Sequence, residues 1–141
     1  MTQLLVRHAK AGKRKEWEGD DRHRPLDDKG WRQADGLVET LSAYPVVHLA
    51  SSGATRCTQT LEPLAEALGL EIEPCRELEE GATPDQTLAL MAKLGDGAVL
   101  CTHGDILENL FGDEGQKGAT RVVELRDGVP VVLEYLPPAA V

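Results

Sequence analysis

Several signals of known protein classes are missing from this sequence of 141 residues. No apolar run approaches the ~20 residues that a membrane-spanning helix needs, and residues 1–4 lack the charged and apolar regions of a signal peptide. Neither G-x-x-x-x-G-K-S/T nor G-x-G-x-x-G occurs, which removes the usual P-loop and dinucleotide-binding signatures. We therefore expect a cytoplasmic protein without a membrane partner.

Cysteine is scarce and widely spaced. Cys57, Cys75 and Cys101 are an odd number without a C-x-x-C pair, so neither a disulfide framework nor a zinc cluster is indicated, and reduced thiols are expected. A phosphatase with a cysteine nucleophile needs Cys-x5-Arg, but the sixth residue after each cysteine is not arginine. The H-E-x-x-H pattern and dense carboxylate clusters with metal-ligand spacing are also absent. A cysteine-based phosphatase mechanism is excluded, and no metal site is indicated.

What is present is the composition of an ordinary globular domain. Hydrophobic residues make up 41% of the chain and charged residues 28%, unlike the proportions of disordered chains and fibres. A chain of this length is most economically one domain, in which folding buries ~70% of the surface of the unfolded chain. We expect residues 1–141 to form a single domain that folds unaided.

The charge is unevenly distributed. The net charge of −9 argues against a dedicated nucleic-acid partner, because such binding needs clustered Lys and Arg side chains. Residues 7–24, however, carry seven basic and four acidic side chains, a net +3, whereas the rest carries 8 basic and 20 acidic ones, a net −12. This basic segment predicts a local binding site for anions and a preference for multiply charged substrates.

Apolar runs and turn signals predict alternating strands and helices. Strands are expected at 3–6, 46–50, 70–73 and 98–102, helices after Asp27 or Asp28, after Gly53, at Pro84 and at Gly104, and a final hairpin at 120–125 and 129–136 around Asp127-Gly128. This order predicts an α/β fold with three α/β/α layers. Its sheet is expected to be mostly parallel, with helices on both faces and an antiparallel C-terminal strand or hairpin.

The chemistry of such folds gathers outside the carboxyl ends of the parallel strands. Arg7 and His8 follow the first predicted strand, and His103 follows the strand at 98–102, so the two histidines are expected to meet at one edge of the sheet. Arg56, in the first turn of the second helix, is expected to face the same edge. Paired arginines favour phosphoryl groups because each guanidinium donates bidentate, charge-assisted hydrogen bonds.

Four sequence blocks, found in order along almost the whole chain, carry a family resemblance. They are Val6-Arg7-His8-Ala9, then Arg24-Pro25-Leu26 with Gly30 and Gln33-Ala34, then Ser51-Ser52 with Ala54, Arg56 and Gln59-Thr60, and finally Cys101-Thr102-His103-Gly104. The set resembles the histidine phosphatase superfamily, also called phosphoglycerate mutase-like. Arg-His-Ala, in place of the Arg-His-Gly of the mutases, is characteristic of the short SixA-type branch. Within that branch, residues 7–26 and 56–65 are similar to the C-terminal phosphatase domain of mycobacterial MutT-type hydrolases.

The resemblance implies a phosphatase mechanism without metal or cofactor. His8 is implied as the nucleophile, which forms a phosphohistidine that water later hydrolyses. Arg7, Arg56 and His103 are implied as the groups that surround the oxygens of the transferring phosphoryl group and stabilise the charge that develops there.

The resemblance also implies roles for two further residues, each with an alternative. The family's general acid, a Glu in Leu-x-Glu, falls on Glu80 when counted without a gap from Gly69-Leu70, with Glu77 as the second choice. The alternative is that these glutamates form a solvated acidic turn, because some SixA-type members lack the acid. Arg14 stands where many members have an Asn that helps to hold phosphate, so it either binds phosphate or points to solvent.

The resemblance therefore implies a metal-independent phosphoric monoester hydrolase or phosphohistidine phosphatase. The expected substrate is a small phosphorylated metabolite, a nucleotide or a protein phosphohistidine, and the expected state is a monomer or weak dimer. One alternative is a non-catalytic phosphate-binding or regulatory module, although both histidines and both arginines are retained. A phosphoglycerate-type mutase is disfavoured, because the chain lacks the long insertions with which mutases enclose their substrate.

Overall fold

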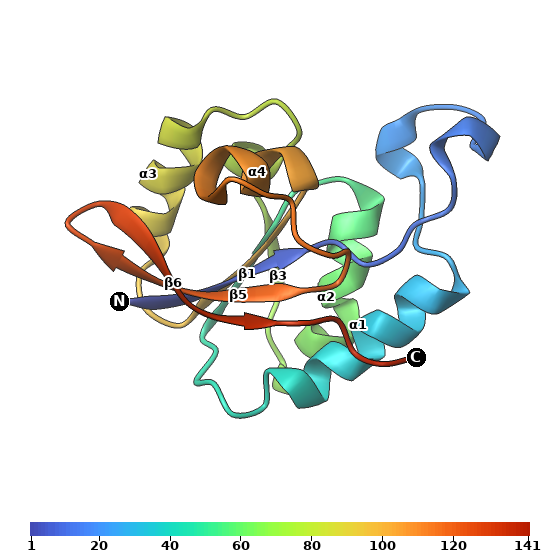
Figure 1. The fold of residues 1–141 in the computed structure, drawn as a ribbon. Helices are drawn as coiled ribbons and strands as arrows, with labels where there is room; N and C mark the ends of the chain where they lie inside the picture. Colours follow the sequence, from blue (N-terminus) through green and yellow to red (C-terminus); the bar gives the residue numbers. More distant parts are fainter.

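Six strands form one mixed sheet in the computed structural model, which describes residues 1–141 (Figure 1). The strands are β1 (Thr2–Arg7), β2 (His48–Ser51), β3 (Ile72–Pro74), β4 (Ala98–Thr102), β5 (Thr120–Arg126) and β6 (Val129–Leu136). Their order across the sheet is β3-β2-β4-β1-β5-β6. The first four are mutually parallel, β5 is antiparallel to β1, and β6 is antiparallel to β5. The predicted fold, including the C-terminal hairpin, is confirmed.

Helices cover both faces of this sheet. They are α1 (Asp28–Thr40), α2 (Thr55–Leu68), α3 (Pro84–Leu94) and α4 (Gly104–Phe111). Local signals define their ends: the Asp27 side chain accepts a hydrogen bond from the Gly30 N–H at the start of α1, and α2 ends at Gly69, whose φ of +67° suits a residue without a Cβ. None of the helices is long and apolar enough to cross a membrane.

Two apolar layers hold the helices against the sheet. Alternate residues of β1 face opposite layers, since Val6 packs with the leucines of α1 and α2, whereas Leu5 packs with Met91 of α3 and Leu107 of α4. Figure 1 accordingly shows α3 and α4 on one side of the sheet and α1 and α2 on the other. Both layers are fully packed around β4, which is buried along its whole length.

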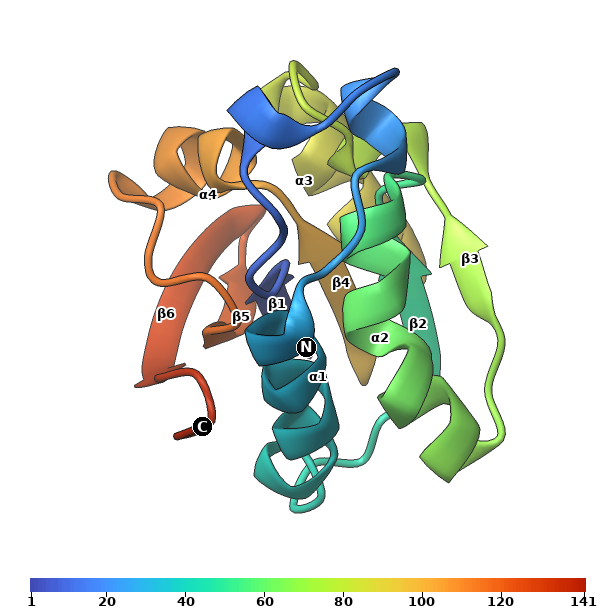
Figure 2. The same cartoon turned by 90° about the vertical axis from the view of Figure 1, so that its right-hand side faces the viewer.

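The register of the parallel strands brings three loop starts to one edge of the sheet. Arg7 of β1 lies beside Thr102 of β4, and Ser51 of β2 lies beside Cys101. β1 and β4 therefore end at the same level and β2 ends one residue earlier, so the loop or helix that follows each strand begins at this edge. The long loop between β1 and α1, drawn in blue at the top of Figure 2, arches over this edge near the start of α2. It contains two short 3-10 turns, η1 (Arg14–Glu16) and η2 (Asp21–His23).

Candidate active site

His8 directly follows β1 and is only 7% exposed. Its backbone N–H donates to Thr102 O at 3.0 Å, which holds it beside the end of β4. Its Nδ1 lies 2.8 Å from Ala9 O. Because a carbonyl oxygen only accepts, Nδ1 carries the proton and Nε2 keeps its lone pair. Burial, aided by nearby positive charges, lowers the pKa of His8 from 6.5 to about 3. His8 is therefore a neutral imidazole near pH 7.

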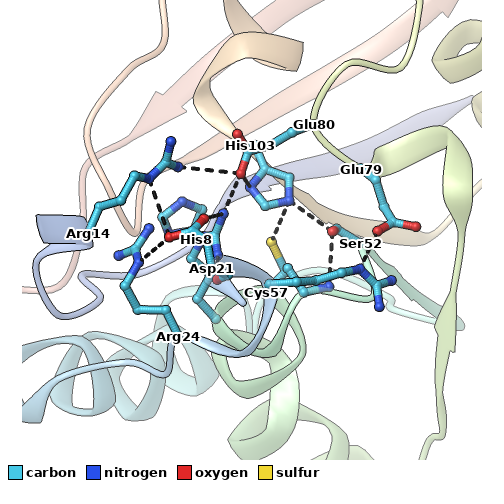
Figure 3. A network of polar contacts seen from close by, with 12 residues as sticks. His8, Arg14, Asp21, Arg24, Ser52, Cys57, Glu79, Glu80 and His103 are labelled. Carbon is cyan, nitrogen blue, oxygen red and sulfur yellow. Dashed lines mark hydrogen bonds and ion pairs between the residues drawn. The ribbon is translucent and has the colours of Figure 1, made fainter. Parts of the chain in front are cut away.

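His103 follows β4 at the N-cap of α4 and meets His8 edge to face, with 5.5 Å between the ring centroids. Its Nδ1 lies 3.6 Å from Glu80 Oε1. Its Nε2, on the opposite side of the ring, lies 2.8 Å from Ser52 Oγ and 3.6 Å from Cys57 Sγ (Figure 3). The predicted convergence of the two histidines is present in the structure.

The arginines that sequence reasoning selected lie around these rings. Arg56, in the first turn of α2, is 1% exposed and contacts Glu80 and the Asp21 carboxylate, with 3.2 Å to Asp21 Oδ2. Arg7 donates from Nη1 to Gly115 O at 2.6 Å. The Nε–H groups of both arginines are buried without a hydrogen-bond partner. Each guanidinium group thus retains a donor that no other protein group uses.

Glu80, and not Glu77, enters this cluster. Its Oε1 contacts Arg56, lies 3.5 Å from Arg14 Nη2 and 3.6 Å from His103 Nδ1. Glu77 makes none of these contacts. Glu80 is thus not part of a freely solvated acidic turn, although its side chain is 44% exposed.

Arg14 is exposed, yet it is turned towards the cluster. Its side chain is 63% exposed, and its Nε lies 3.3 Å from Asp21 Oδ1 (Figure 3). Asp21 also accepts from Arg24 Nε at 2.8 Å. The Arg24 hydrogen bond and the charges of Arg56 and Arg14 lower the pKa of Asp21. Asp21 therefore ties the loop between β1 and α1 to the start of α2.

These side chains enclose a cavity of about 240 Å³ whose lining contains no hydrophobic residue. It is lined by Arg7, His8, Arg14, Arg56, Glu80, His103, Gly104, Asp105 and Glu114. An adjoining cavity of about 280 Å³ shares Arg56, Glu80 and His103. A larger hollow of about 490 Å³ lies along β2 and β3 but contains none of the candidate residues. Volume alone does not identify the site, whereas the gathering of cations around a neutral histidine does.

Comparison with known proteins decides the family. Residues 3–93 match the family model of the histidine phosphatase superfamily (branch 1). The chain belongs to the histidine phosphatase superfamily. It is 35% identical, over 156 aligned positions, to an 8-oxo-(d)GTP phosphatase of Mycolicibacterium smegmatis; the match covers 97% of this chain and 48% of the relative. The chain thus spans about half the length of that curated relative.

Solved histidine phosphatase structures share the fold. The protein histidine phosphatase SixA, solved with tungstate, superposes with a TM-score of 0.79 at 20% identity, covering 98% of this chain and 97% of that one. SixA from Agrobacterium tumefaciens also gives 0.79, at 24% identity and 97% coverage of both chains. The predicted phosphoglycerate mutase-like fold is confirmed. Membership of a phosphatase family supports the expected enzyme class, a phosphoric monoester hydrolase.

Sequence reasoning gave no role to three residues of this histidine phosphatase site. Asp21 could have been found from the sequence, since a carboxylate inside a basic segment is a candidate partner for the arginines around it. Ser52 was placed at the end of β2 but received no function, and Cys57 was expected only to be a reduced thiol. Burial raises the pKa of the Cys57 thiol, but hydrogen bonds with Cys101 and His103 outweigh burial and lower it to about 6. The ring of His103 thus has two polar neighbours at its buried end.

Proposed function

We propose that residues 1–141 form a single histidine phosphatase domain that hydrolyses phosphoric monoesters through a phosphohistidine at His8. The observation that carries this proposal is the state of His8. Its Nδ1 proton is engaged by Ala9 O, its pKa is lowered to about 3, and it lines a cavity with three arginines. The unprotonated Nε2 is therefore ready to attack phosphorus near pH 7.

In the first step, Nε2 of His8 forms a bond to phosphorus while the bond between phosphorus and the leaving oxygen breaks. Arg7, Arg56 and His103 donate hydrogen bonds to the phosphoryl oxygens, where charge develops. Glu80, held between Arg56 and His103, delivers a proton to the leaving oxygen. An incoming phosphoryl dianion competes with the Glu80 carboxylate for Arg56.

In the second step, water attacks the phosphorus of the phosphohistidine. Glu80 accepts a proton from this water, the bond between phosphorus and Nε2 breaks, and inorganic phosphate leaves while His8 returns to its neutral state. The guanidinium groups supply the positive charge in both steps, so the scheme uses no metal. No group of three or more His, Cys, Asp or Glu side chains is placed to hold a metal ion.

The substrate is proposed to carry negative charge beyond the transferred group. Lys13 and Lys15 are exposed beside Arg14 and take part in none of the ion pairs, whereas Lys10 is neutralised by Asp27. Lys13 and Lys15 thus add unpaired positive charge next to Arg14, which lines the cavity, in an otherwise acidic chain.

Two substrate classes meet this requirement. The Mycolicibacterium smegmatis relative is an 8-oxo-(d)GTP phosphatase, which favours a nucleotide. The SixA structures are those of phosphohistidine phosphatases, which favours a phosphohistidine on an acidic protein surface. Because the chain spans about half of the relative, the relative's substrate is a candidate for this domain and no more.

Hydrolysis of p-nitrophenyl phosphate in excess chelator, with vanadate as inhibitor, tests the proposal. His8→Ala is expected to reduce turnover to below a few per cent while the circular dichroism spectrum stays unchanged. His48→Ala is the matched control, because His48 is exposed at the start of β2 and outside the cavity. Phosphate binding without turnover in the wild type would support the non-catalytic module instead. Full activity of His8→Ala would overturn the nucleophile assignment.

A further inference from the structure

The buried end of the His103 ring has a hydroxyl partner. Ser52 is completely buried, and its Oγ lies 2.8 Å from His103 Nε2. The same oxygen accepts a hydrogen bond from the Ala54 N–H at 3.2 Å. The Ala54 N–H takes one of the two acceptor positions of the hydroxyl, so its proton and one lone pair remain for Nε2, and the tautomer of His103 decides which of them is used.

The exposed end of the ring favours the same arrangement. Nδ1 of His103 lies 3.6 Å from the Glu80 carboxylate, a group that accepts hydrogen bonds when ionised. A proton on Nδ1 and a lone pair on Nε2 therefore place a donor towards the carboxylate and an acceptor towards the Ser52 hydroxyl. In this tautomer the Nδ1–H donor points into the cavity that His8 lines.

Cys57 competes for the same nitrogen. Its Sγ lies 3.6 Å from Nε2, and hydrogen bonds with Cys101 and His103 lower the pKa of its thiol. A thiolate would draw the proton onto Nε2 and leave Nδ1 without a donor for the phosphoryl group. The Ser52 contact is 0.8 Å shorter than the Cys57 contact, and a hydroxyl is the better donor.

We propose that Ser52 is a positioning residue that fixes His103 in the tautomer whose Nδ1–H faces the phosphoryl group. Ser52 does not touch the substrate; it acts through His103, as the partners of ligand histidines do when they set the tautomer and orientation of the ring. The catalytic consequence rests on the proposed function, whereas the tautomer itself does not.

The tautomer is measured directly by long-range ¹H–¹⁵N correlation spectra of the histidine side chains, assigned with His103→Gln. In the wild type near pH 7, Nδ1 is expected to be protonated and Nε2 unprotonated. Ser52→Ala is expected to move the proton towards Nε2, and Ser52→Thr to restore the wild-type pattern. Ser51→Ala is the matched control, because Ser51 is equally buried but its Oγ donates to a backbone carbonyl, Ser52 O.

Kinetics give the second readout. Ser52→Ala is expected to lower kcat by ~10- to 100-fold, the range seen when the partner that orients a metal-ligating histidine is lost, and to weaken vanadate inhibition by a similar factor with a smaller change in KM. Ser51→Ala is expected to change neither quantity. A role in folding alone would lower stability but leave the tautomer in place.

The outcomes separate this proposal from the proposed function. Retention of the Nδ1–H tautomer in Ser52→Ala overturns the role of Ser52, whatever the activity. A tautomer that responds to Cys57→Ala and not to Ser52→Ala assigns the control to the sulfur and also overturns it. Absence of phosphatase activity in the wild type, with the tautomer shift observed, refutes the proposed function but leaves the positioning of His103 by Ser52 intact.

Discussion

The site has two regions that differ in burial. The buried centre consists of Arg7, His8, Arg56 and His103, of which the Arg56 and His103 side chains are 2% and 4% exposed. The rim consists of the loop residues 12–23 together with Glu80, and here the Arg14 and Glu80 side chains are 63% and 44% exposed. Charges in the centre act at low dielectric, whereas those at the rim are screened by water and salt. The centre is therefore suited to the phosphoryl group common to all substrates, and the rim to the part that differs between them.

The largest effect is expected from the centre. Arg56→Lys keeps the positive charge but loses the planar fork, so kcat/KM should fall by ~10²- to 10³-fold for every substrate. Arg32→Lys, on an exposed turn of α1, is the control and should have no effect. A loss confined to one substrate class would show that Arg56 belongs functionally to the rim, and the division into two regions would fail.

Glu80 lies where the two regions meet, and its effect should depend on the leaving group. Glu80→Gln should slow an alkyl phosphate by ~10²- to 10⁴-fold but slow phosphohistidine much less, because imidazole leaves without much help from a proton. Rates for both substrates are compared with those of Glu77→Gln, whose parent residue lies outside the cluster. Equal losses on both substrates would remove the general-acid role.

How much of the fold and of the site could be predicted from the sequence also differs between the centre and the rim. The strands are short apolar runs bounded by turn signals, and the rule for parallel sheets brings His8 and His103 to one edge even though 95 positions separate them. Arg56 follows from helical geometry, because the first turn of α2 begins at that edge. The centre was therefore predictable from local patterns and topology.

The rim was less predictable, because its geometry depends on ion pairs between loops. Sequence spacing alone left both Glu77 and Glu80 as candidates for the general acid, and the contact of Glu80 with Arg56 distinguishes them. The role of Asp21 depends on a loop conformation in which one carboxylate meets side chains from three parts of the chain. Ser52 lies behind the centre, against His103, and has no chemical signature of its own, since a serine after a strand usually caps or ends it.

The burial of His8 should also appear in the pH dependence of stability. The unfolded chain binds a proton at His8 below pH 6.5, whereas the folded chain does so only near pH 3. The free energy of unfolding therefore falls as the pH drops through this window, and His8 should contribute a loss of about 2 kcal/mol between pH 7 and pH 5. Denaturant unfolding of the wild type and of His8→Gln at both pH values measures it. An equal pH dependence in both proteins would show that His8 is not held as a buried neutral ring.

The smallest effect is expected from Lys13 and Lys15, the rim lysines that form no ion pair. Raising the salt concentration through ~0.15 M, where exposed charges interact only over about 8 Å, should lower kcat/KM for a nucleoside diphosphate more than for p-nitrophenyl phosphate. The double substitution Lys13→Ser and Lys15→Ser should remove much of this difference and leave the chemistry intact. Arg14→Ser tests separately the rim residue that lines the cavity. If the difference survives both variants, the basic loop is merely solvated and the preference has another source.

The central claim is that the phosphoryl group is transferred to His8. Brief mixing with a labelled phosphoryl donor, an alkaline quench that preserves phosphohistidine, and peptide mass spectrometry test it most directly. We predict one acid-labile phosphoryl group on the His8 peptide, present in His48→Ala and absent from His8→Ala. Label on another residue, or steady turnover with no label on His8 at any quench time, would contradict the account.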